Sequence, residues 1–375
     1  MSRALFKPLR VRSLEIKNRI VISPMMQHAA PGGFVNNWHL VHLGKFALGG
    51  AGLIFTESTA VSPMGRIGRD DAGLWLDEHV KPWEAVVDFV HQNGSAIGVQ
   101  LGHAGRKAGS KALWEGGEAL TTEQMLADDP KWIRLGPSAI AAGEGWSTPK
   151  AMTQDDIAQA VEQFVAAAQR ADQAGFDVIE LHFGHGYLVT SFLSPISNQR
   201  TDAYGGDLEG RMKLAIEIAA RVRSVWPSEK PLWCRLSVVD GAVGGWSEED
   251  TVVLVRRLQA VGVDVFDCSS GGLTEQTKAL PVPRGLGFQV PFAHKVRTET
   301  GAITQAVGMI VDPVQAEEII TSGAADLVAI GREALFDPYW PLHAQWALER
   351  DPKFTNWHLR HGVWLQKRQT FLDSL

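Results

Sequence analysis

Two histidines separated by two residues, His182 and His185, are the side chains with the clearest chemical potential in this sequence. They follow an apolar run, and Tyr187 lies two residues further on. Such a pair can be part of a metal site, although a complete site needs further ligands. Two imidazole N–H groups could instead stabilise a developing oxyanion, with Tyr187 as a proton donor. The spacing alone leaves both alternatives open, together with a structural role in the core.

Eight short apolar segments could position these side chains as strands of one sheet. Their cores lie near residues 20–23, 53–56, 97–101, 178–182, 232–237, 265–269, 303–307 and 327–330. The stretches between them have helical patterns, and several end at a glycine just before the next strand. This alternation indicates a parallel sheet. No G-x-G-x-x-G turn follows the first strand, which argues against an open dinucleotide-binding sheet. We therefore predict an α/β fold, a (β/α)8 TIM barrel.

The length of 375 residues suits one such barrel with extended connections, because a TIM barrel typically takes roughly 250 residues. We predict that residues 1–375 form a single domain. Residues 103–152 are predicted to be a capping insertion after the third strand, and residues 345–375 a C-terminal tail. Helices are predicted to begin after Thr153, Ser247 and Asp312, which are good N-cap residues.

Alternation of side chains along the strands predicts which polar groups point into the barrel. Apolar neighbours on either side indicate that Gln100, Glu180, His182 and Arg235 point inward. A buried arginine needs an anionic or strongly accepting partner. That partner could be an internal acid such as Glu180, or an electron-rich ligand, and the pattern does not decide between them.

Composition excludes several classes of function. The net charge of −6 and the lack of a run of Lys and Arg argue against nucleic-acid binding. Only two cysteines are present, Cys234 and Cys268, which excludes a disulfide framework or an iron–sulfur cluster and fits a reducing, cytoplasmic setting. No apolar run is long enough for a signal peptide or a membrane span. A small-molecule substrate is the expected partner.

Several motifs, in order along nearly the whole chain, resemble those of the Old Yellow Enzyme family. The motifs are residues 18–25 (NRIVISPM), 57–61 (ESTAV), 100–107 (QLGHAGRK), 180–188 (ELHFGHGYL), 194–202 (SPISNQRTD), 267–271 (DCSSG), 307–309 (VGM) and 330–332 (IGR). They look most similar to the bacterial branch that includes xenobiotic and thermophilic-type ene reductases.

The resemblance implies FMN as cofactor, NAD(P)H as reductant, and no metal. The implied reaction is reduction of the activated C=C bond of α,β-unsaturated carbonyl or nitro compounds, by hydride transfer from flavin N5. His182 and His185 would bind the substrate oxygen, and Tyr187 would donate the proton. The implied FMN-binding residues are Pro24, Met25, Met26, Ala60, Gln100, His182, Arg235, Gly308, Gly331 and Arg332. The implied substrate-binding residues are His28, His182, His185, Tyr187 and Trp364. The branch also implies a homodimer or homotetramer.

Three positions depart from the pattern of this branch, one of them Val307, where the family often has an aromatic residue. Met26 stands where the branch usually has Cys, and His28 where it commonly has Tyr. These changes favour an alternative, a specialised FMN oxidoreductase or dehydrogenase of one biosynthetic or degradative pathway. His28 could also be a loop histidine bound to water. A barrel that binds a phosphorylated substrate without flavin is a further alternative. The tail containing Trp364 could reach a neighbouring subunit or pack on its own barrel.

Overall fold

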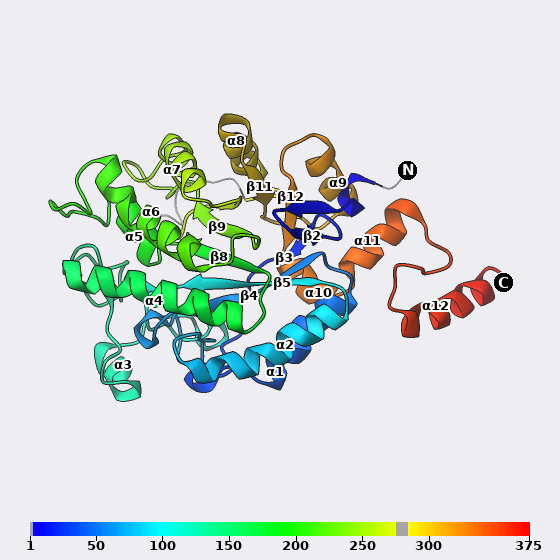
Figure 1. Ribbon diagram of the computed structural model, residues 1–375, viewed down its shortest axis with the longest axis horizontal. Coiled ribbons are helices and arrows are strands. Elements are labelled where there is room, and N and C mark those ends of the chain that lie inside the picture. The colour runs from blue at the N-terminus through cyan, green and yellow to red at the C-terminus, as the bar shows by residue number, and fades with distance from the viewer. Residues whose placement is uncertain (1–2, 275–283) are drawn as a thin grey trace.

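The centre of the computed structural model is a closed barrel of eight parallel strands, and the structure describes residues 3–274 and 284–375 (Figure 1). Going around the barrel, the strands follow one another in chain order. They are β3 (Ile20–Ile22), β4 (Leu53–Ala60), β5 (Ala96–Gly102), β8 (Val178–Phe183), β9 (Leu232–Ser237), β10 (Val265–Ser269), β11 (Ile303–Ala306) and β12 (Leu327–Ile330). Each coincides with a predicted strand segment, so the predicted fold class is confirmed.

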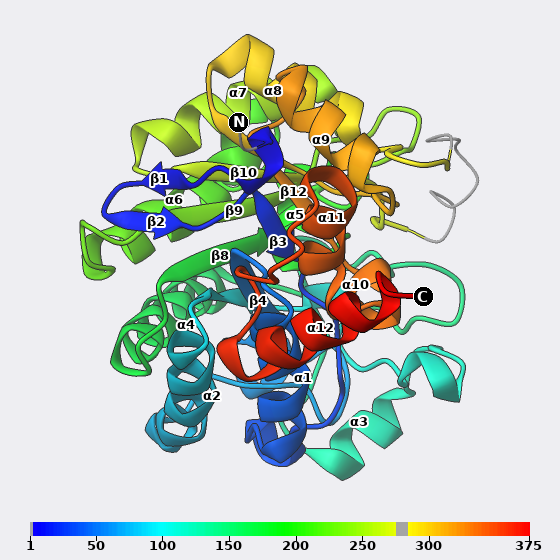
Figure 2. The same ribbon diagram turned by 90° about the vertical axis from the view of Figure 1, so that its right-hand side faces the viewer.

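Helices surround the barrel, as the two perpendicular views show (Figures 1 and 2). They are α1 (Asn37–Leu48), α2 (Val80–Gln92), α4 (Gln154–Gln173), α5 (Leu188–Leu193), α6 (Leu208–Val225), α7 (Glu248–Ala260), α8 (Val290–Thr300), α9 (Pro313–Thr321) and α10 (Arg332–Phe336). The side chains of Thr153, Ser247 and Asp312 accept hydrogen bonds from backbone N–H groups in the first turns of α4, α7 and α9. The three predicted helix starts are therefore correct.

An apolar plug fills the end of the barrel where the strands begin. The ring centroids of Phe55 and Trp233 lie 5.3 Å apart inside it. The hairpin of β1 (Leu9–Val11) and β2 (Leu14–Ile16) closes this end, because Val11 and Ile16 pack into the same cluster. The eight predicted strands did not include this hairpin, whose strands have three residues each.

A polar layer lies two residues further along the strands. It contains Gln100, Glu180, Arg235, Asp267 and Gln305, all buried. Gln100 Nε2 donates to Glu180 Oε1 over 2.8 Å, and Arg235 Nε lies 3.1 Å from Asp267 Oδ2. The predicted inward direction of Gln100, Glu180 and Arg235 is therefore correct, and the acid nearest to Arg235 is Asp267 rather than Glu180. Burial and the neighbouring Asp267 raise the pKa of Glu180 to about 8.

The predicted insertion and tail contain short elements outside the barrel. Residues 103–152 include α3 (Thr122–Asp128) and a parallel pair, β6 (Leu135–Gly136) with β7 (Lys150–Ala151). The tail contains the end of α11 (Trp340–Glu349) and α12 (Leu359–Leu372). Within the described ranges, none of the helices has the length and apolar character needed to cross a membrane.

Candidate active site

His182 and His185 lie together at the end of β8, one layer beyond the polar residues of the barrel interior. Their ring centroids are 5.0 Å apart, with an interplanar angle of 79°. Loss of solvent around the rings and the positive charge of Arg235 lower both pKa values well below the usual range. His182 Nδ1 accepts a hydrogen bond from Gly184 N over 3.4 Å, which leaves the proton of the neutral ring on Nε2. The pair is therefore neutral at physiological pH.

A tight loop after β8 turns His185 back toward His182. His185 has a left-handed backbone with φ 62°, which is uncommon for a residue other than glycine. At Gly186, a Cβ would lie 2.2 Å from the carbonyl oxygen of Gly272, so the close approach of the two loops requires glycine. Lys107 Nζ fixes this approach by donating to the carbonyl oxygens of His185 and Gly272, each over 2.9 Å.

Hydroxyl groups from the neighbouring strands hold His185. Its Nε2 lies 2.7 Å from Ser269 Oγ, and its backbone N–H donates to Ser237 Oγ over 2.8 Å. Gln289 Nε2 also donates to Ser269 Oγ over 3.2 Å. Three consecutive strands, β8, β9 and β10, therefore contribute to the position of one imidazole ring.

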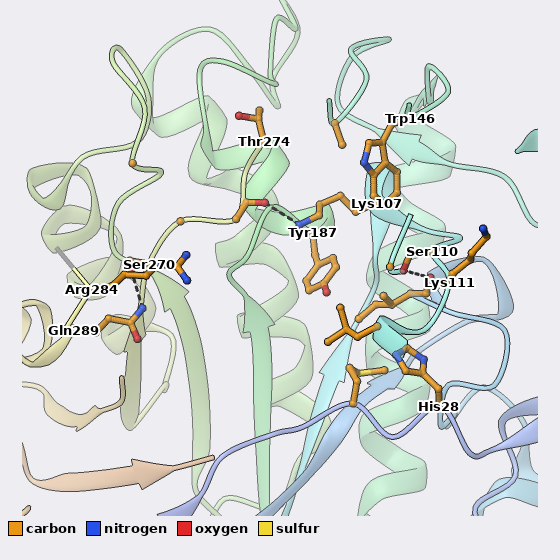
Figure 3. Close-up of a pocket in the computed structure, with 18 of the residues that line it drawn as sticks. His28, Lys107, Ser110, Lys111, Trp146, Tyr187, Ser270, Thr274, Arg284 and Gln289 are labelled. Carbon is orange, nitrogen blue, oxygen red and sulfur yellow. Dashed lines mark hydrogen bonds between the residues drawn. The ribbon is translucent and has the colours of Figure 1, made fainter. Parts of the chain in front are cut away.

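Tyr187 completes this group on the side of the open cavity. Its ring centroid is 5.1 Å from that of His182, with an interplanar angle of 72°. Figure 3 shows its phenol pointing into a cavity of about 600 Å³, whose lining also includes Met26, His28 and Lys107. Burial raises the pKa of Tyr187 well above its usual value, so the phenol keeps its proton at neutral pH.

A second cavity, of about 300 Å³, lies against the ends of β9, β11 and β12. Its lining includes Arg235, Gly308, Gly331 and Arg332. Phe288 and Gln289 line both cavities, so the two hollows adjoin. Gly308 has a φ of 115°, and a Cβ there would lie 3.0 Å from Gln289 Oε1.

These features fit the FMN that the resemblance implies. The Arg235 guanidinium faces the cavity with Asp267 as its neighbouring charge, and glycine keeps the strand ends open beside it. A flavin and its phosphate would offer acceptor groups along this path.

The other predicted site residues lie at three places. Met25 is beside Gly331, since a Cβ on that glycine would lie 3.7 Å from the methionine sulfur. Pro24 precedes it just after β3, and Ala60 ends β4. Trp364 lies on α12, 68% exposed, and lines a separate surface hollow with Tyr339 and Trp357. Within one chain, the structure does not bring Trp364 to the cavity.

Sequence reasoning missed two acids that matter for the site. Asp267 lies between Phe266 and Cys268, so the alternation that placed Arg235 could have placed it inside the barrel as well. Asp71 hydrogen-bonds His28 from a loop 43 residues away, and no local pattern marks it. Among the described residues, no group of three or more His, Cys, Asp or Glu side chains is arranged to hold a metal ion.

Comparison with known proteins gives a consistent result. The sequence model of the NADH:flavin oxidoreductase / NADH oxidase family matches residues 4–351. The NADPH dehydrogenase of Geobacillus thermodenitrificans (strain NG80-2) is 43% identical over 347 residues, which are 92% of this chain and 94% of that protein. The NADPH dehydrogenase of Bacillus subtilis (strain 168) is 41% identical over 343 residues, or 91% and 94% of the two chains.

A solved structure of morphinone reductase superposes with a TM-score of 0.78 at 26% sequence identity, covering 95% of this chain and 93% of the other. The match extends around the whole barrel, whereas the last part of the tail lies beyond the matched residues of the family.

Proposed function

Because the chain belongs to the NADH:flavin oxidoreductase / NADH oxidase family and is an FMN-type oxidoreductase that uses NAD(P)H, we propose that it reduces the activated C=C bond of α,β-unsaturated carbonyl or nitro compounds. When bound, FMN would supply the redox chemistry, which is hydride transfer between NAD(P)H and the β-carbon of the substrate. Membership of this family also argues against the alternative of a barrel that binds a phosphorylated substrate without flavin.

The neutral pair His182 and His185 is the observation that carries this proposal. Two neutral imidazoles that converge at a barrel mouth can donate hydrogen bonds to a carbonyl or nitro oxygen. The donors would stabilise the negative charge that develops on this oxygen as the β-carbon accepts the hydride.

Tyr187 would then donate a proton to the α-carbon. Its phenol is protonated, faces the cavity and lies beside the histidine pair. Lys107 Nζ lies 5.2 Å from the centroid of the Tyr187 ring and fixes the nearby loop by donating to the carbonyl oxygen of His185. The end of β8 and the loop after it would thus hold the substrate oxygen and deliver the proton.

The cofactor contacts in this proposal are those that the family resemblance implies. Pro24, Met25, Met26, Ala60 and Gln100 would contact the flavin ring, and His182 would reach it from β8. Arg235 would stabilise negative charge on the ring, at the bottom of the smaller cavity. Gly308, Gly331 and Arg332 would hold the phosphate at the ends of β11 and β12, the phosphate position common in TIM barrels.

A second candidate is a specialised FMN oxidoreductase or dehydrogenase of one pathway. The hydrogen bond between His28 and Asp71 favours it, because it gives one wall of the substrate cavity a polar group with a fixed direction. A homodimer or homotetramer is also part of the proposal, and light scattering of the holoenzyme would measure it.

The two half-reactions are reduction of the flavin by NADPH and its reoxidation by the substrate. Each can be measured separately by anaerobic stopped-flow absorbance of the flavin. Enzyme reduced by NADPH should be reoxidised rapidly by cyclohex-2-enone. In His182→Ala this step should slow by about 10²–10³-fold, the range found when one oxyanion donor is removed. Reduction by NADPH should change much less.

His343→Ala is the control, since His343 is an exposed histidine that pairs with Asp337 at the surface. It should leave both half-reactions unchanged. Equal loss of both half-reactions in His182→Ala would show that the histidines do not selectively bind the oxidising substrate. If wild-type enzyme is reduced by NADPH but reoxidised by no enone, the second candidate is favoured.

A further inference from the structure

His28 lines the same cavity as Tyr187, the neighbour of the histidine pair, and its pKa is shifted in the opposite direction to the pKa values of that pair. Its side chain is 11% exposed and lines the large cavity with Met26, Ile67 and Tyr187 (Figure 3). The Trp114 ring packs against the His28 ring in a T-shaped arrangement, with centroids 5.8 Å apart. The mechanism proposed above gives this residue no defined role.

A loop is built around the His28 ring. Nδ1 lies 2.8 Å from Asp71 Oδ1, and Asp71 is fully buried. The other oxygen of Asp71 accepts hydrogen bonds from the backbone N–H groups of Ile67 and Gly68, over 2.5 and 2.9 Å. Gly68 allows the close approach, since a Cβ there would lie 2.7 Å from His28 Nδ1. Three hydrogen bonds therefore hold the Asp71 side chain in one position against the ring.

This arrangement sets the proton positions on His28. Because the Asp71 oxygen accepts in this pair, Nδ1 carries a ring proton. Within the described ranges, Asp71 is the only hydrogen-bond partner of the ring, so Nε2 is left for the cavity. Burial lowers the pKa of His28, but the hydrogen bond and charge of Asp71, with the charges of Glu57 and Asp70, outweigh it and raise the pKa. A second proton, on Nε2, makes the ring a cation.

The rest of the cavity lining has the same sign. The described lining of this cavity contains no Asp or Glu side chain, whereas Lys107, Lys111 and Arg284 belong to it. Lys107 Nζ binds two backbone carbonyls, and Lys111 Nζ lies 3.4 Å from Glu118. His28 adds to this lining a ring nitrogen whose direction Asp71 fixes, in a chain whose overall charge is negative.

We propose that His28, held by Asp71, binds a carboxylate on the substrate, at the end of the molecule away from the oxygen that His182 and His185 bind. The inference rests on the proposed function, because it takes the histidine pair as the other anchor. The substrate class is therefore an activated alkene that carries a carboxylate, bound between one neutral and one cationic wall.

Matched ligands that are not turned over can test this. 4-Hydroxybenzoate and 4-hydroxybenzamide have the same phenol and differ in the charge of the opposite end. Binding to the oxidised holoenzyme would be measured by calorimetry. At pH 6 we expect the benzoate to bind about 10- to 100-fold more tightly than the amide, the effect of one charge-assisted hydrogen bond. This preference should decline as the pH rises and His28 loses its proton, while amide binding stays constant.

The side chains that face His28 must be considered in interpreting this pH profile. They are Asp71 in contact, Glu57 and Asp70 at longer range, and Tyr187, Lys107, Lys111 and Arg284 along the cavity. Lys and Arg remain charged up to higher pH than His, so they cannot produce a decline near neutral pH.

His28→Asn is the main variant, because Asn cannot ionise and tolerates the left-handed backbone at this position, where φ is 47°. It should abolish the preference for the benzoate and leave amide binding within a factor of about three. Asp71→Asn should reduce the preference, provided that its melting temperature and flavin absorbance match wild type. His91→Asn is the control: His91 forms a similar 2.8 Å pair with Asp177, outside the cavity.

The outcomes separate the inference from its premise. A preference that survives in His28→Asn, or equal binding of both ligands by wild type, overturns the assignment to His28. His182→Ala should weaken both ligands alike. If wild type binds neither phenol, the histidine pair itself is not the anchor, and the proposed function fails with it.

Discussion

Replacing Glu180 with Gln tests the polar layer inside the barrel. Burial and the neighbouring Asp267 raise the pKa of Glu180 from 4.5 to about 8. Between these pH values the folded protein keeps a proton that the unfolded chain has released. The contribution of Glu180 to the free energy of unfolding therefore falls as the pH rises through this window. One pKa unit corresponds to about 1.4 kcal/mol, so the complete window corresponds to on the order of 5 kcal/mol.

Glu180→Gln removes this titration and keeps the shape of the side chain. The variant and wild type should have similar free energies of unfolding near pH 5. At pH 8 the variant should be the more stable protein by several kcal/mol. The reason is that ionisation of Glu180 in the unfolded chain lowers the free energy of unfolding of wild type, whereas Gln cannot ionise. Urea unfolding followed by tryptophan fluorescence, at a constant excess of FMN and with a thiol reductant, would measure the difference at each pH.

The control is Glu144→Gln, which changes an exposed carboxyl group. It should show no such dependence on pH. A constant difference between Glu180→Gln and wild type from pH 5 to 8 would refute the reasoning, because it would mean that Glu180 is ionised in the folded protein, stabilised by Arg235.

Three further predictions concern the site and the core. Tyr187→Phe should slow reoxidation of the flavin by an enone by about 10²-fold or more, through loss of the proton donor, with little change in reduction by NADPH in the same stopped-flow assay. Gly308→Ala should weaken FMN binding, measured by fluorescence of the released flavin, because the left-handed backbone and the contact with Gln289 strain any Cβ by about 1–3 kcal/mol. Phe55→Ala should lower the free energy of unfolding in urea by about 3–5 kcal/mol while FMN affinity stays unchanged, since it creates a void in the plug.

Much of the barrel is predictable because its signals are local. Buried parallel strands are short apolar runs, and a polar residue within such a run can be assigned to one face by alternation. This reasoning correctly placed Gln100, Glu180 and Arg235 inside. It could not predict the β1–β2 hairpin, whose strands are too short to show a period and whose stability comes from contacts with residues far along the chain, such as Trp233.

The site shows the same division between local and distant information. His182 at the end of β8 and His185 and Tyr187 in the loop after it are close in sequence, so local spacing brings them together in the structure. The environment of His28 depends on Asp71 and Gly68, which another loop supplies. Sequence alone therefore identified the departure at His28 but not the surroundings that raise its pKa.

The layered interior of the barrel also bears on how this protein can change over evolutionary time. Phe55 and Trp233, in the plug at one end, contribute stability but do not line the cavities. The residues that line the cavity at the other end come mainly from loops, and the polar layer separates the two. Substitutions in the loops around His28 can therefore be selected while the contacts of the plug continue to stabilise the fold. New substrate preferences in such a scaffold should arise first by substitutions at the mouth, without compensating changes in the plug.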